Sequence, residues 1–194
     1  MYDSGMKPNS KFHQTKGRLL FGFIMALLSG IGLGSSASAT KIEAGLAYPL
    51  VAGMAGQSFN SNLGLTGAIT FAPMIEPWIS NWVSVDYYSL TWRSDTAASF
   101  RILPILAGVS LPGKVTEGVT SEFGLGLGGA IGYLNSPGVT AYRTFGYFAA
   151  QFRGGMEVDL GSGISTFARI PVTVIVGAKP MTFLSFILGA GYQF

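Results

Sequence analysis

Residues 122–133 read Glu-Phe-Gly-Leu-Gly-Leu-Gly-Gly-Ala-Ile-Gly-Tyr. Large apolar residues alternate with small ones along this stretch, and a period of two indicates a β-strand. The strand therefore has one bulky apolar face and one face made almost entirely of glycine and alanine. The bulky face consists of Phe123, Leu125, Leu127, Ile131 and Tyr133, with Gly129 as its one small member.

The same alternation recurs clearly near both ends of the chain and in residues 147–160. Together with the spacing of turn-forming residues, it predicts eight strands of about the length that a tilted membrane-spanning strand requires. In two of these strands the pattern is weaker: the alternation is lost by Leu90, and residues 100–111 are apolar on both faces, which leaves their register open. The predicted strands are 41–50, 63–72, 82–92, 100–111, 121–133, 145–160, 164–176 and 184–194.

The small-residue faces carry too few polar side chains to form the solvated exterior of a soluble β-sandwich. If the faces are exchanged, the bulky apolar side chains contact lipid and the small ones fill a narrow interior. Strands satisfy all their backbone hydrogen bonds in lipid only when the sheet closes on itself. The sequence therefore predicts an all-β fold, an eight-stranded antiparallel up-and-down transmembrane β-barrel formed by residues 40–194 and preceded by a cleaved signal peptide.

The basic excess of the chain lies in its first 39 residues. Of the formal net charge of +3, all comes from four basic residues and one acidic residue before position 19, and residues 40–194 are neutral. The basic region is followed by an apolar run, 19–33, and by Ala37-Ser38-Ala39, which together are typical of a secretory signal peptide. We expect cleavage after Ala39, with Ala37 and Ala39 as the recognised small residues and either Met1 or Met6 as the start. The run is too short for a membrane anchor, and the neutral remainder predicts no nucleic-acid partner.

The connections and aromatic residues fit one orientation of the barrel. Segments 73–81, 112–120 and 161–163 are expected to form inner turns, and 51–62, 93–99, 134–144 and 177–183 to form outer loops. Aromatic side chains fall near both predicted rims, where amphipathic rings are favoured. Those at the inner rim are Trp78, Trp82, Phe123, Phe167, Tyr192 and Phe194, and those at the outer rim are Tyr48, Trp92, Phe100, Tyr133 and Tyr147.

The C-terminal segment Leu188-Gly-Ala-Gly-Tyr-Gln-Phe194 resembles the assembly signal of bacterial outer-membrane proteins, with Leu188, Ala190, Tyr192 and Phe194 as its alternating members. With the signal peptide and eight strands, the whole pattern resembles the small barrels of the outer-membrane protein A and X type. The resemblance implies a bacterial outer-membrane location. It also implies contact with outer-membrane lipid and lipopolysaccharide, and with the barrel assembly machinery during biogenesis.

Catalytic and metal chemistry have few candidate residues in this chain. Some small outer-membrane barrels modify lipid A with a histidine, a serine and a carboxylate, but the one histidine here is His13, in the leader, and there is no cysteine. A serine nucleophile needs an adjacent base. The glycines of Gly124–Gly129 lie within a strand and have no following helix to form a phosphate loop. We therefore predict no enzyme, no cofactor and no metal site.

The charged residues on the small-residue faces are the remaining candidates for a functional site: Glu43, Asp86, Glu122, Arg153, Glu157 and Arg169. We favour a paired network inside a filled barrel, because buried charge must be paired. The 161–163 hairpin would place Arg153 opposite Pro171 and Arg169 opposite Gly155. The predicted function is a structural or surface-interaction barrel. The alternatives are a narrow channel or small-molecule transporter and, less favoured, a lipid A-modifying enzyme.

If Phe194 belongs to an assembly signal, Phe194→Ser should reduce membrane insertion far more than Phe148→Ser. The second change removes only lipid-facing apolar area near the outer rim. Insertion yield is measured by heat-modifiable gel mobility, and equal yields for the two variants would contradict the assembly signal.

Overall fold

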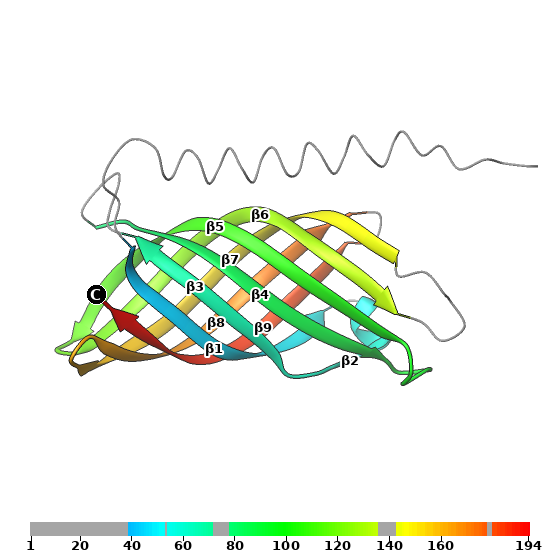
Figure 1. The fold of residues 1–194 in the computed structure, drawn as a ribbon, viewed down its shortest axis with the longest axis horizontal. Helices are drawn as coiled ribbons and strands as arrows, with labels where there is room; N and C mark the ends of the chain where they lie inside the picture. Colours follow the sequence, from blue (N-terminus) through cyan, green and yellow to red (C-terminus); the bar gives the residue numbers. More distant parts are fainter. Residues whose placement is uncertain (1–38, 53, 72–77, 136–142, 178–179) are drawn as a thin grey trace, which may run out of the picture. The chain divides into compact units, whose positions relative to one another are not determined.

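The computed structural model describes residues 39–52, 54–71, 78–135, 143–177 and 180–194, and these form one closed antiparallel barrel (Figure 1). Eight long strands make the wall, and a short strand and a 3-10 turn lie in the first outer loop. No helix among the described residues is long and apolar enough to cross a membrane. The wall strands are β1 (Ala39–Ala52), β3 (Gly64–Phe71), β4 (Ser80–Trp92), β5 (Ser99–Thr116), β6 (Val119–Asn135), β7 (Arg143–Gly161), β8 (Ile164–Val176) and β9 (Met181–Gln193); the loop elements are η1 (Met54–Gln57) and β2 (Phe59–Ser61).

Each wall strand pairs with its neighbour in the chain, and β9 pairs with β1 to close the ring. The predicted all-β, eight-stranded up-and-down barrel is thus confirmed. The predicted signal peptide and Ala37 lie outside the described residues, and Ala39 begins β1.

One of the inner turns is tighter than the sequence predicted. The 161–163 hairpin is as expected, with Gly161, Ser162 and Gly163 all at positive φ. The predicted turn 112–120 is wrong: β5 continues to Thr116 and β6 starts at Val119, so that only two residues connect them. Gly118 has a φ of 73°, which glycine adopts without strain, and this allows the tight turn despite Pro112 and Gly113 in the strand.

The outer face of the wall is apolar, as the alternation predicted. Leu125 and Leu188 are 62% and 67% exposed, and every wall strand has large apolar residues that are exposed in the same way. Exposure of so much apolar surface is unfavourable in water and favourable in a bilayer. The apolar faces therefore form the lipid-contacting belt of the barrel.

The structure assigns the register that the sequence left open in β4 and β5. Tyr88, Leu90, Ile102 and Leu106 are buried, and they therefore face the lumen. With Phe183 and Ile175, they form part of one buried apolar cluster. The interior is therefore not filled by small residues alone. Glycines line the inward face of β6, and large side chains of β4 and β5 fill the space in the lumen.

Three aromatic residues that we predicted at the rims are buried inside the barrel instead, and a fourth, Tyr147, packs against the same buried cluster. Trp82, Phe100 and Phe167 are buried, because each shares the inward parity of its strand. Trp82 occupies the space left by two glycines: a Cβ on Gly108 or Gly126 would collide with its ring. Other predicted rim aromatics, such as Trp78, Phe123 and Tyr192, are exposed on the outer face.

This complementarity predicts different results for two glycines on neighbouring strands. Gly126→Ala should lower the free energy of unfolding by about 1–3 kcal/mol, because the added methyl group overpacks against Trp82. Gly154→Ala is the matched control, since its Cβ would meet only the ring of Phe123 at ordinary contact distances of 3.6 and 3.7 Å. The control should stay within about 1 kcal/mol of the wild type in urea unfolding from lipid vesicles. Equal destabilisation of the two variants would contradict the packing described here.

Candidate functional site

Six charged side chains meet in the lumen toward the inner end of the barrel. They come from four strands, and the period-two alternation of each strand points them inward. Glu43 and Arg169 are only 2% and 6% exposed, so the set is largely withdrawn from bulk water. We call this set the charge network; its members are Lys41 and Glu43 of β1, Glu122 of β6, Arg153 and Glu157 of β7, and Arg169 of β8.

Arg169 is the centre of the charge network. Its Nη1 and Nη2 donate to the two carboxylate oxygens of Glu43 at 2.5 and 2.8 Å, which is a bidentate pair. Its Nε donates to Glu122 Oε2 at 2.9 Å, and Nη2 lies 2.9 Å from the same oxygen. The two edges of one guanidinium thus hold carboxylates from β1 and β6, two strands that are separated by four positions around the barrel.

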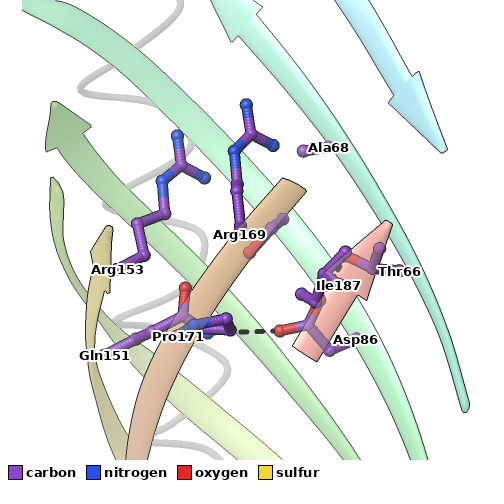
Figure 2. A pocket seen from close by; sticks show the side chains of 9 residues that line it. Thr66, Ala68, Asp86, Gln151, Arg153, Arg169, Pro171 and Ile187 are labelled. Atoms are coloured by element: carbon purple, nitrogen blue, oxygen red, sulfur yellow. Dashed lines mark hydrogen bonds between the residues drawn. The ribbon is translucent and has the colours of Figure 1, made fainter. Parts of the chain in front are cut away.

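Arg153 lies next to Arg169, as Figure 2 shows. It forms an ion pair with the other oxygen of Glu122, so that Glu122 is shared between the two arginines. Each guanidinium also lies over an aromatic ring: Arg153 is 3.8 Å from the ring centroid of Trp82, and Arg169 is 4.2 Å from that of Phe167. Cation–π contacts of this kind are strongest where water is excluded. The rings of Trp82 and Phe167, which lie on the inward faces of their strands, therefore stabilise the two arginines.

Lys41 completes the charge network, and our sequence analysis did not include it. Its Nζ lies 2.6 Å from Glu43 Oε1 and also forms an ion pair with Glu157. The signal was present in the sequence, because residues 41 and 43 share one face of a strand. With Lys41 counted, the charge network contains three acids and three bases and is formally neutral.

Asp86 is the one predicted lumen residue that the structure does not place in the charge network. It is 2% exposed, and its partners are neutral donors. Thr66 Oγ1 donates to it at 2.5 Å, and the Tyr88 hydroxyl and Gln151 Nε2 donate at 3.3 Å each. Figure 2 shows the Gln151 contact, and the same amide nitrogen also donates to Thr173 Oγ1 at 2.9 Å. Sequence analysis missed these neutral partners, because their types are common on any strand.

A small cavity lies between Asp86 and the arginines, with about 10 Å³ of room for the centre of a water molecule. Ser84 and Arg153 line it, and the Ser84 hydroxyl and Arg153 Nε are buried polar atoms without a protein partner. The space is about what one water needs, and its polar lining suits one. Among the described residues, no three potential ligands are arranged to hold a metal ion.

The predicted assembly-signal residues lie on the outer face of β9 and just beyond its end. Leu188, Ala190, Tyr192 and Phe194 are all exposed on this face. The rings of Tyr192 and Phe194 meet edge to face, with their centroids 5.4 Å apart. They therefore present one continuous apolar strip at the C-terminal strand.

The barrel is similar to solved structures of bacterial outer-membrane proteins. Neisserial surface protein A matches with a TM-score of 0.61 and 12% identity, over 82% of this chain and 100% of that one. Ail, the attachment invasion locus protein of Yersinia pestis, matches with a TM-score of 0.52 and 14% identity, over 81% of this chain and 100% of that one. No family model matches the sequence, and no curated protein matches it.

These likenesses show the fold, which is that of the small bacterial outer-membrane barrels, and confirm the resemblance predicted from the sequence at that level. The apolar outer face independently requires a lipid bilayer around the closed wall. The closed wall is thus that of a membrane-spanning barrel.

The pairing within the charge network predicts strong coupling between Arg169 and Glu43. Arg169→Met alone should cost about 3–5 kcal/mol of unfolding free energy, because Glu43 and Glu122 lose their shared partner. The double variant Arg169→Met, Glu43→Gln should cost less than the sum of the single variants by at least about 1 kcal/mol, measured by urea unfolding from vesicles.

The matched control is the pair Arg153 and Glu157. Both belong to β7, but Arg153 pairs with Glu122 and Glu157 with Lys41. Their substitutions, Arg153→Met and Glu157→Gln, should couple more weakly than those of Arg169 and Glu43, because the two residues share no direct partner and are linked only through the rest of the charge network. Additive costs for Arg169 and Glu43 would show that the ion pairs are not formed in the membrane.

Proposed function

We propose that this protein is a closed outer-membrane barrel with a structural or surface-interaction role, and that it conducts no solute through its lumen. The observation that carries the proposal is the filling of the lumen by two successive layers. One layer is apolar and the other is the charge network.

The apolar layer lies toward the outer end of the barrel. Tyr88 and Phe183 are fully buried, and their ring centroids are 5.3 Å apart. Leu90, Ile102 and Ile175 belong to the same buried cluster. A hydrated ion crossing this layer would have to give up its water among side chains that are mostly apolar, and the Tyr88 hydroxyl there is already hydrogen-bonded to Asp86.

The charge network fills the lumen further in. A conducting pore lined by charge needs water around its side chains. Here Glu43 and Arg153 are buried, and their charges are satisfied by protein partners in place of water. The arrangement favours a structural role, in which ion pairs connect strands across the lumen.

We favour a role at the cell surface over catalysis, because residues that could catalyse acyl transfer are few in the barrel and its fold is shared with a surface protein. Residues 40–194 contain no histidine and no cysteine, so no imidazole or thiolate is available for acyl transfer. One solved protein of the same fold, Ail, is the attachment invasion locus protein of Yersinia pestis. For this chain we propose interaction through the outer loops and rim.

Planar-bilayer recordings test the closed lumen. The purified barrel should give no discrete conductance steps under conditions in which a general porin gives them. The control variant is Ala149→Leu, which adds volume at a fully buried position facing the lumen. Steps in the wild type that shrink in this variant would identify solute passage through the lumen and would contradict the proposal.

A further inference from the structure

The two strands that close the barrel, β1 and β9, have no turn between them. They come from opposite ends of the described chain and lie side by side, β1 in blue and β9 in red (Figure 1). Their ladder runs without a shift from the pair Lys41–Gln193 to the pair Ala52–Thr182. In a hairpin the turn fixes the register of the two strands. At the closing pair the register must therefore be fixed by side chains.

The alternation of side chains does not fix this register completely. A shift of one residue would turn every apolar side chain into the lumen, but a shift of two residues keeps each side chain on its own face. The outward residues from Ile42 to Leu50 and from Leu184 to Tyr192 are all apolar, so contact with lipid is satisfied in the shifted registers as well. Because stagger, tilt and diameter of a barrel are linked, such a shift would change the whole wall.

A pair of glycines excludes one of the two possible shifts. Gly45 lies directly opposite Gly189, and a Cβ on these residues would lie 2.6 and 2.4 Å from a backbone oxygen of the other strand. A shift of β1 in one direction would place Gly45 opposite the bulky Ile187, for which this close approach leaves no room. A shift in the other direction would place it opposite Gly191, and the glycines permit that register.

The ion pair between Arg169 and Glu43 spans the closing pair. Arg169 belongs to β8 and Glu43 to β1, so their contact passes over the inward face of β9. At this level β9 presents Gly189 and Gly191 to the lumen. A Cβ on Gly191 would lie 3.4 Å from Glu43 Cγ and 3.3 Å from Lys41 Cε, which shows that both side chains run directly over this glycine. The glycines of β9 thus leave the path of the ion pair open.

Both shifts of two residues would break this ion pair. Such a shift moves Glu43 by about 7 Å along β9, whereas the two hydrogen bonds from Arg169 are 2.5 and 2.8 Å long. In the native register Glu43 lies opposite Gly191. One shift would bring Gly45 to this place, which leaves Arg169 without that carboxylate, and the other would bring Lys41, which has the same charge as Arg169. Water cannot replace the lost partner, because Glu43 and Arg169 are buried.

We infer that Arg169 and Glu43 form a register lock, which selects the one alignment of β1 with β9 in which the barrel closes. Lys41 supports the register lock through its ion pairs with Glu43 and with Glu157 of β7. The charge network thereby determines the stagger of the strands in addition to stabilising the lumen. The register lock is independent of the proposed surface role and of conduction through the lumen.

Engineered disulfides can measure the register, because the chain contains no cysteine. Tyr48→Cys with Phe186→Cys reports the native register, since these residues are directly opposed on the outward face. Tyr48→Cys with Leu184→Cys, or with Leu188→Cys, reports a shift of two residues in one or the other direction. In the native register each of these two offset pairs is diagonal, with Cα atoms about 7–8 Å apart, which is too far for a disulfide.

The pairs are oxidised after the protein has been refolded into lipid vesicles, and the crosslinked fraction is read from gel mobility. With Arg169 present, only the native pair should crosslink. In the Arg169→Met background the ratio of native to offset crosslinks should fall at least about tenfold, which corresponds to about 1.4 kcal/mol of preference between registers. A side chain that only stabilised the barrel would lower all crosslinks together and leave this ratio unchanged.

Arg153→Met is the matched control. Arg153 is as buried as Arg169, but its ion pair with Glu122 joins the adjacent strands β7 and β6 and does not involve β1. It should keep the native ratio. The double variant Arg169→Met, Glu43→Gln leaves no orphan carboxylate at position 43, so it tests the register even if Arg169→Met alone does not fold, and its ratio should fall as well. Exclusive native crosslinking in the double variant, or an equal fall in Arg153→Met, would overturn the register lock.

Discussion

The structure depends on one constraint, which is that backbone polar groups in lipid must find their partners within the protein. Closure of the sheet satisfies this constraint, and every wall strand from β3 to β9 has a hydrogen-bonded neighbour on both sides over most of its length. Closure of the sheet also determines which side chains face lipid and which face the lumen. Because the outer face meets lipid, bulky apolar residues point outward, and the charges that remain in the strands must be accommodated inside.

Inside the lumen, the charged side chains are accommodated by forming ion pairs with one another. Three acids and three bases form one neutral set, in which each charge removed from water has an opposite charge at hydrogen-bond distance. Arg169 of β8 connects Glu43 of β1 with Glu122 of β6, which lie on opposite sides of the ring. A bridge of this kind constrains the cross-section of the barrel, which backbone ladders between adjacent strands constrain only locally. Asp86 does not belong to the charge network, and its hydrogen-bond donors are the uncharged side chains of Thr66, Tyr88 and Gln151.

The fold could be predicted because the alternation of large and small residues along a strand is a local pattern that can be read from the sequence. The glycine-rich face of β6 and the 161–163 hairpin carried this information, and the pairing of Arg153 with Pro171 followed from the hairpin alone. The position of Lys41 could have been found by the same parity. The inward positions of Trp82 and Phe167 could not, because they depend on space left by glycines on other strands and on arginines that need a ring. In β5 both faces are apolar, since one faces lipid and the other packs in the lumen, and no local pattern distinguishes them.

Some wall strands extend past the end of a neighbour, as β1 does along 48–52 and β5 along 111–116, and the location of these edges at the ends of the barrel follows from the same constraint. The first outer loop folds back as η1 and β2, and β2 adds to β4 beyond the end of β3, so the outer part of β1 is left without a partner on that side. Such an edge is tolerated only where solvent or headgroups can hydrogen-bond to it.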